Sequence, residues 1–203
     1  FGWLVGLVLN RAKGKEMITS MILGFFANGI YQLVFIILVG RVIPMSNPGM
    51  LMESGFGLRN TIDLFEVRKA FDNWIFGGIT NIPVMPLLFS ALIFLFIYLF
   101  FKTKLGQDMR AIGQDMHVAE VAGIHVDRTR LKAIIISTVL AGWGQILYLQ
   151  NLGTLNTYTN HEQVGLFAVA ALLIGGATVE KATWKEAVLG TFLFHLLFVV
   201  SPL

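Results

Sequence analysis

The segment formed by residues 17–40 limits what this chain can fold into more than any other. It reads MITSMILGFFANGIYQLVFIILVG and contains no charged side chain. A membrane-spanning helix needs about 20 predominantly apolar residues, so this segment is long enough to cross a bilayer. The whole chain has a mean hydropathy of +0.73, and only 13% of its 203 residues are charged, against about 25% in an average soluble domain. The composition therefore predicts a membrane protein.

Apolar segments recur along the rest of the chain, at residues 86–101, 131–150, 164–174 and 187–203. The segment 164–174 is too short to cross alone and is followed by Gly175 and Gly176, which favour a helix break, so it predicts a re-entrant or broken helix. The expected fold is all-α, a polytopic helical membrane protein with about five membrane segments. We expect a single transmembrane domain over residues 1–203, as part of a longer chain.

Basic residues indicate which ends of these segments face the cytoplasm. The stretch RAKGKE before residue 17 has three basic residues and one acidic residue, and residues 102–130 carry five basic ones. Positive charge beside membrane segments favours the cytoplasmic side. Residues 41–83 and 151–163 are then external loops, the first with an amphipathic helix in residues 64–76. The formal net charge of +3 is small, so nucleic acid is not an expected partner.

The cytoplasmic stretch 106–130, GQDMRAIGQDMHVAEVAGIHVDRTR, contains its own helix signals. Asp115 is placed to cap a short helix 116–122, Gly123 to end it, and Asp127 to cap the next helix. Apolar side chains fall on one side of the short helix and at its ends: Val118, Val121, Ala122, Met116 and Ile124. Such a surface, facing out of the membrane, favours a partner protein, and packing on neighbouring cytoplasmic loops is the alternative.

Polar side chains inside the segment 17–40 are the other candidates for function, at Thr19, Ser20, Asn28 and Gln32. Polar groups at this depth need partners, so they either bond to neighbouring helices or line a passage for a hydroxyl-rich solute. Phe25 could stack on a solute ring.

The sequence offers little support for a metal site or an enzyme. There is no cysteine, and the four histidines are scattered over loops and one membrane segment: His117, His125, His161 and His195. His195 lies within a membrane segment, where it is either a hydrogen-bonded packing residue or a functional group. No closely spaced metal ligands, paired carboxylates or Gly-rich phosphate loop are visible in the sequence.

Residues 106–130 resemble the cytoplasmic loop of permease subunits in the sugar, nucleoside and branched-chain amino acid branch of ATP-binding cassette importers. The matching residues, in order, are Gly106, Arg110, Ala111, Ile112, Gly113, Ala119, Ala122, Gly123, Ile124, Arg128, Leu131, Ala141 and Gly142. Residues 167–193, around Ile-Gly-Gly, and residues 14–30 are similar to two further parts of the family. Asp115-Met116 replaces the usual Asn-Pro, and Glu180-Lys181 replaces a frequent glycine pair.

The resemblance implies one permease subunit of an importer in the bacterial cytoplasmic (inner) membrane. Its partners would be ATP-binding cassette subunits, a second permease subunit in a homo- or heterodimer, and an extracytoplasmic solute-binding protein. ATP and Mg²⁺ would bind the ATPase subunits, so this chain would bind no cofactor and need no catalytic residue. Helix 116–122 would be the coupling helix, in a loop over residues 102–130. The implied ATPase-coupling residues are Arg110, Met116, Val118, Ala119, Val121, Ala122, Gly123, Ile124 and Arg128.

The expected solute is a simple sugar, with a nucleoside or a branched-chain amino acid as alternatives. The candidate substrate-path residues are Thr19, Phe25, Asn28 and Gln32. Two readings from other classes remain at this stage, an ATP-independent carrier or channel and an intramembrane enzyme.

Overall fold

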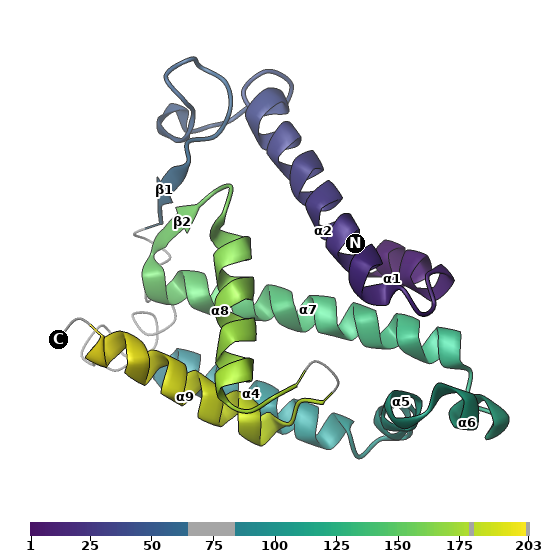
Figure 1. The fold of residues 1–203 in the computed structure, drawn as a ribbon. Helices are drawn as coiled ribbons and strands as arrows, with labels where there is room; N and C mark the ends of the chain where they lie inside the picture. Colours follow the sequence, from purple (N-terminus) through teal and green to yellow (C-terminus); the bar gives the residue numbers. More distant parts are fainter. Residues whose placement is uncertain (65–83, 179–180, 202–203) are drawn as a thin grey trace. The chain divides into compact units, whose positions relative to one another are not determined.

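A computed structural model describes residues 1–64, 84–178 and 181–201 (Figure 1). The chain forms two compact units, Phe1–Leu155 and Asn156–Leu203, and each is described by itself. Both units are mostly helical, as the composition predicts. The amphipathic helix predicted for residues 64–76 falls, beyond its first residue, outside the described residues.

The first unit contains long apolar helices at the predicted places. Helix α2 (Glu16–Leu33) continues as a π-helical turn, η1 (Val34–Leu38), and is followed by α4 (Val84–Phe100) and α7 (Val126–Leu152). The continuous 23-residue helix of α2 and η1 and the 27-residue α7 are each long and apolar enough to cross a membrane. Helix α4 meets α5 (Lys104–Gln114) at a bend of 77°, and this bent pair would make a third crossing. The described residues therefore form an integral membrane protein with two clear spans, or three with the bent pair.

Helix α1 (Gly2–Arg11) packs against α7 through two buried glycines. A Cβ at Gly2 would lie 2.8 Å from Thr138 Oγ1, and one at Gly6 would lie 2.5 Å from Leu131 Cδ1. Residues four apart share one face of a helix, and small residues at this spacing let two membrane helices approach closely. The pair Gly2 and Gly6 therefore fixes α1 on the first half of α7.

The ends of α2 and α7 that lie away from α1 are followed by short irregular elements. After η1 the chain forms a one-turn 3₁₀ helix, η2 (Pro48–Met50), and strand β1 (Thr61–Asp63). Strand β1 pairs with β2 (Thr154–Asn156), which directly follows α7. The backbone N–H of Leu64 also donates to the carbonyl of Gly153 at 2.8 Å. Residues 41–64 and the end of α7 are therefore on the same side of the unit, as the predicted topology requires.

At the opposite end, two helices that run outside the long spans form the loop between α4 and α7. Helix α5 was not predicted, and α6 (Met116–Val121) is the short helix that was. The turn into α5 is tight: Thr103 Oγ1 accepts from the backbone N–H of Gly106 at 3.3 Å. A Cβ at Gly106 would lie 2.6 Å from Phe101 Cα, so only glycine fits between the ends of α4 and α5 without a shift.

The second unit is a hairpin of α8 (Asn160–Ile174) and α9 (Trp184–Val200). The predicted helix break is confirmed, because α8 ends before Gly175 and Gly176 has a φ of +95°. A Cβ at Gly175 would overlap the backbone of Glu186, and one at Gly190 would overlap that of Ala171. The two helices therefore touch through their backbones. The re-entrant placement of this hairpin stays a prediction.

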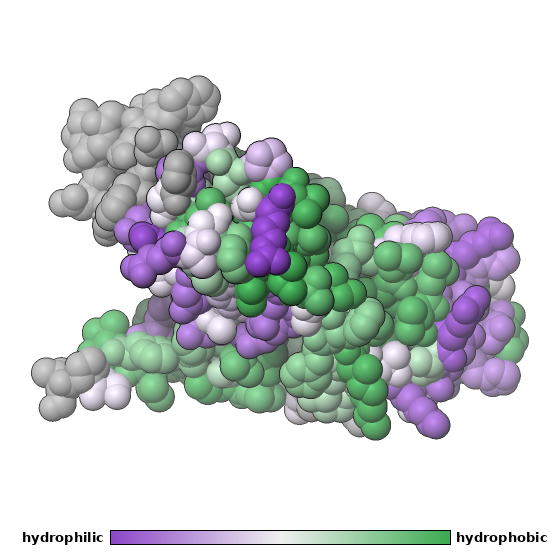
Figure 2. Space-filling view, turned by 90° about the horizontal axis from the view of Figure 1, so that it is seen from above, coloured by the Kyte–Doolittle hydropathy of each residue, from purple (hydrophilic) through white to green (hydrophobic). Residues whose placement is uncertain are grey.

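Much of the surface that the chain presents is apolar (Figure 2). Large apolar side chains are exposed on several long helices, for example Phe25 on α2, Leu95 on α4 and Phe192 on α9. Hydrophilic residues gather at the end of the view where α5, α6 and the start of α7 lie. Exposed apolar helices of this kind are expected to meet lipid or further membrane helices.

Candidate coupling loop

Helix α6 has a specific start and a specific end. Asp115 adopts an extended backbone, and its carboxylate accepts hydrogen bonds from the backbone N–H groups of His117 at 2.8 Å and Val118 at 3.0 Å. The bonds from Val118 and His117 stabilise the charged carboxylate and lower the pKa of Asp115. Gly123 follows with a φ of +84°, which favours glycine. Both predicted signals are confirmed.

The predicted cap of the next helix is wrong. Helix α7 begins at Val126, and the N-cap position before it is occupied by His125, whose side chain makes no capping bond. Asp127 lies inside the first turn, where a carboxylate is still favourable beside the positive end of the helix. Its carboxylate meets Lys13 Nζ at 2.9 Å. The acidic residue is therefore an ion-pair partner of the preceding loop, and the backbone that it would have capped starts one residue earlier.

The inner face of α6 belongs to a small core of the loop itself. Ala119 is 2% exposed and packs with Ile112 of α5 and Val126 of α7. The half-buried Ile124 packs against the same cluster, and its backbone N–H donates to the carbonyl of Ala119 at 3.0 Å. These contacts hold α5, α6 and the start of α7 together.

The outer face of α6 is apolar and uncovered. Val118 is 63% exposed and Val121 is 77% exposed, with Met116 and Ala122 exposed beside them. The predicted outward apolar surface is therefore present at these four positions, which we call the outer face. Of the other predicted coupling residues in this helix and turn, Ala119 and Ile124 face inward and act as its support.

Charged side chains surround the outer face. The Arg110 guanidinium lies 5.0 Å from the centre of the Phe101 ring, a cation–π contact that directs it along α5. Arg128 is exposed and lines a hollow of about 420 Å³ between the end of α6, the start of α7 and the loop before α2. The hollow is lined by Lys13, Glu120, Gly123, Ile124, His125, Val126, Asp127 and Arg128.

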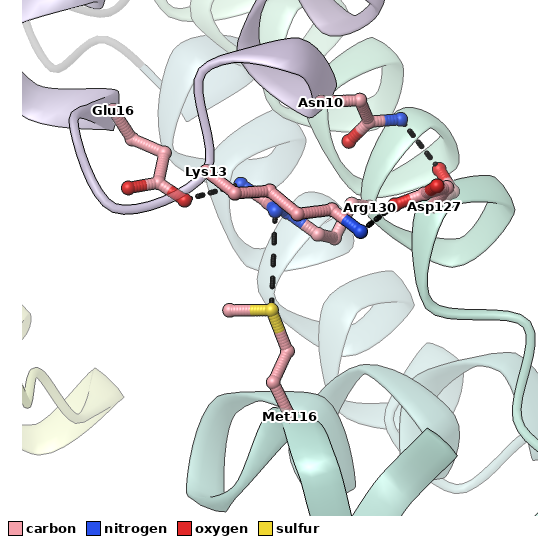
Figure 3. A network of polar contacts seen from close by, with 6 residues as sticks. All are labelled: Asn10, Lys13, Glu16, Met116, Asp127 and Arg130. Carbon is pink, nitrogen blue, oxygen red and sulfur yellow. Dashed lines mark hydrogen bonds and ion pairs between the residues drawn. The ribbon is translucent and has the colours of Figure 1, made fainter.

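A network of polar contacts joins the loop to the base of α2 (Figure 3). Arg130 of α7 reaches the Glu16 carboxylate at the start of α2 with Nη2 at 2.9 Å, and Met116 Sδ at the start of α6 with Nη1 at 3.9 Å. Asn10 Nδ2, at the end of α1, donates to the backbone carbonyl of Asp127 at 2.8 Å. Three helices and the loop are thus joined at the end of the unit that carries the basic residues.

The candidate path residues of α2 do not share one face. With 3.6 residues per turn, Phe25 and Gln32 lie within about 60° of Asn28 around the helix, and Thr19 lies about 180° away from it. Asn28 and Gln32 are half-buried, and Phe25 is exposed. The geometry of α2 therefore groups Phe25, Asn28 and Gln32 and separates Thr19 from them.

His195 has a local partner. Its Nδ1 lies 2.9 Å from the carbonyl of Thr191, one turn earlier in α9, and its ring packs edge-on to Phe194. These contacts fit the packing role. Among the described residues, no group of three or more His, Cys, Asp or Glu side chains could hold a metal ion.

Comparison with known proteins decides the family. The profile of the family described as "Branched-chain amino acid transport system / permease component" matches residues 1–202. The chain belongs to this permease family. The resemblance of residues 106–130 is thereby confirmed.

Individual relatives of this permease chain are ABC transporter permeases named for different solutes. The probable permease YphD of Escherichia coli is 28% identical over 60% of this chain and 36% of its own length. The nucleoside permease NupB of Lactococcus lactis is 26% identical over 86% of this chain and 46% of its own length. The xylose permease XylH of Haemophilus influenzae is 28% identical over 57% and 31%. The chain spans about half the length of these relatives or less, and no solved structure matches it significantly.

Sequence reasoning missed the polar network of the permease. Glu16 and Arg130 were counted only as charges that set the topology, because their pairing depends on the way α2 and α7 approach each other. A signal was available: Glu16 is the only acidic residue in RAKGKE, and Asp127 and Arg130 offer both signs of charge at the start of α7. The Gly2 and Gly6 pair was also missed, although its spacing of four is visible in the sequence.

Proposed function

We propose that the chain forms part of the membrane-spanning permease subunit of an ATP-driven importer, and that its outer face docks on the ATPase subunit. The observation that carries this proposal is the capped helix α6, which is supported from within by Ala119 and exposes Val118 and Val121 at the basic end of the chain. Family membership supports the transport role.

The physical properties of α6 suit a docking element. Fully burying a valine side chain is worth about 1.5–3 kcal/mol, so two valines could supply a substantial part of a specific contact. Because the inner face is tied to α5 and α7, a push on the outer face moves the start of α7 with it. Arg110, Gly123 and Arg128 flank this surface, and the two arginines could pair with carboxylates of the partner.

The proposed topology has about five membrane segments, namely α2 with η1, α4, α7, and the hairpin of α8 and α9, in which α8 is the broken or re-entrant one. The basic loops before α2 and between α4 and α7 face the cytoplasm of a bacterium, across its inner membrane. The ion pair between Lys13 and Asp127 supports a common side for these two loops.

The complete transporter would contain two permease subunits, two ATPase subunits and an external solute-binding protein. ATP and Mg²⁺ would bind the ATPase subunits, and nucleotide-driven closure of these subunits would rock the permease between outward-open and inward-open forms. No catalytic role is assigned to this chain, because the hydrolysis would take place on its partner.

The proposed solute is a simple sugar, and Phe25, Asn28 and Gln32 are the residues proposed to face its path. An amide beside an aromatic ring suits a solute that combines hydroxyl groups with a ring. A nucleoside is the second candidate, because the named nucleoside permease matches 86% of this chain, against 57% for the named xylose permease.

The test expresses the full-length permease with the ATPase and binding protein encoded beside it. We expect a stable complex with the ATPase, and ATP-dependent uptake of radiolabelled xylose, or of uridine, into proteoliposomes. Uptake that needs no ATPase subunit would instead identify an ATP-independent carrier. Saturable uptake of uridine without uptake of xylose would move the solute to the nucleoside class.

A further inference from the structure

We propose that Arg130 is a positioning residue that makes helix α2 follow the coupling helix α6. The inference rests on the proposed function and adds to it the link that carries movement from the ATPase side to the helix with the candidate path residues. It is built on three side chains, from α2, α6 and α7.

The contacts of Arg130 give the link its direction. One amino group of the guanidinium meets Glu16 at 2.9 Å and the other lies 3.9 Å from the Met116 sulfur. Helix α6 is already tied to α7 by Ala119 and Val126, and the contact to Met116 adds to that tie. The ion pair to Glu16 extends the same connection to the first turn of α2.

Helix α2 has few other ties to the rest of the unit at this point. None of its residues is buried, so its position does not depend on a core that it shares with α7. Its first turn follows the short connection from α1, which includes Gly14 with a φ of +84°. A single partly buried ion pair at the first turn is therefore a strong constraint on where α2 points.

The neighbouring ion pair is a natural comparison. The side chains of Lys13 and Asp127 are 53% and 58% exposed, whereas those of Arg130 and Glu16 are 14% and 35% exposed. Water and salt screen exposed pairs strongly, and such pairs contribute little. Lys13 also precedes α2, so it holds the connecting loop and not the helix itself. The account therefore assigns the coupling to Arg130 and makes Lys13 the matched control.

The chemistry of arginine fits the position. Its planar guanidinium carries donors on two sides and can reach two partners at once, whereas a lysine ammonium is a single point of charge. A carboxylate at the first turn of α2 is also favoured by the positive end of that helix. The pair is thus placed where it holds together without other partners.

The experiment follows α2 directly in the assembled transporter. The 203 residues contain no cysteine, so one cysteine is placed in turn at residues 24–27, which together cover every side of α2. The rate of maleimide labelling of the permease is measured with and without ATP and Mg²⁺, and the amount of co-purified ATPase is measured in the same sample. We expect ATP to change labelling by at least about fivefold at one or more positions, the lower end of typical allosteric coupling.

Arg130→Gln and Glu16→Gln should each reduce this ATP-dependent change to less than about twofold and leave the co-purified ATPase unchanged. The double exchange Glu16→Arg with Arg130→Glu restores the ion pair and should restore most of the change. Lys13→Gln should behave as the unaltered protein.

The possible failures are distinguishable. If no ATPase co-purifies with the unaltered permease, the proposed function and this inference both fall. If the ATPase co-purifies and ATP still changes labelling in Arg130→Gln and Glu16→Gln, or never changes it at any of the four positions, only the coupling role of Arg130 is overturned. If the exchanged pair does not restore the change, the ion pair is not the link.

Discussion

The cytoplasmic loop and helix α2 are joined by an ion pair but differ in how their side chains are covered. The loop has a small core of its own, formed by Ile112, Ala119 and Val126. Helix α2 has no buried residue. The chain itself therefore defines the shape of the loop, and what remains exposed there, Val118 and Val121, is available to a partner. The position of α2 depends on its ends and on whatever surrounds it in the membrane.

The largest effect is expected where the core of the loop is damaged. Ala119→Asp would bury a carboxylate with no partner among apolar side chains, which we expect to make local opening of the loop easier by about 3 kcal/mol. Amide hydrogen exchange of α6 in the full-length permease measures this. Ala122→Asp is the matched control, because Ala122 is exposed on the same helix. Equal exchange in the two variants would contradict the assignment of an inner and an outer face.

A substitution in α2 should affect transport and not stability. Asn28→Ala should lower the uptake of the accepted solute by roughly tenfold, the effect of losing one hydrogen bond of about 1.5 kcal/mol in the path. The thermal stability of the purified permease should change little. Thr19→Ala lies on the opposite side of α2 and should leave uptake near its original rate. Unchanged uptake in Asn28→Ala would remove this residue from the path.

The end of α6 allows a smaller test of the loop. Gly123→Ala meets no atom within 4 Å but must keep a φ of +84°. We expect backbone strain alone to weaken the end of α6 by about 1 kcal/mol, and less in Gly123→Asn because asparagine tolerates this region better. Exchange rates of the amides after α6 would show the order glycine, asparagine, alanine. Equal rates for all three would mean that the turn relaxes into another conformation.

The start of α6 should respond to pH. Two backbone N–H groups lower the pKa of Asp115 below its usual value in the folded loop. The unfolded loop then binds a proton at higher pH than the folded one, so the cap stabilises α6 above the ordinary aspartate pKa. Its contribution is lost as the pH falls through the lowered value. Asp115→Asn keeps an acceptor and should remove this pH dependence, which exchange measurements of α6 across acidic pH, corrected for intrinsic rates, would detect.

The sequence was sufficient for features that depend on neighbouring residues. The long apolar segments became α2, α4 and α7 within a few residues of their predicted bounds, and Asp115 and Gly123 delimit α6 as expected. These follow from length, apolar content and the geometry of one helical turn, which need no knowledge of the rest of the fold.

What the sequence could not give depends on how distant segments meet. Asp127 has the right residue type for a cap, but Lys13 of the preceding loop takes its carboxylate. The spacing of Asn28 and Thr19 looked equivalent in a list of polar residues, but a continuous helix places them on opposite sides. The pairing of Arg130 with Glu16 joins residues far apart in the chain, and no local pattern predicts it.

The most direct test of the central claim is whether the ATPase subunit remains bound when the outer face of α6 is changed. Val118→Asp combined with Val121→Asp places charge on the outer face and leaves Ala119 in its core, and Val118→Thr with Val121→Thr keeps the side-chain shape while reducing apolar contact. The account predicts that the aspartate variant loses the ATPase on purification, that the threonine variant binds it more weakly, and that the thermal stability of the isolated permease is unchanged in both. An ATPase that co-purifies in full with the aspartate variant would contradict the account.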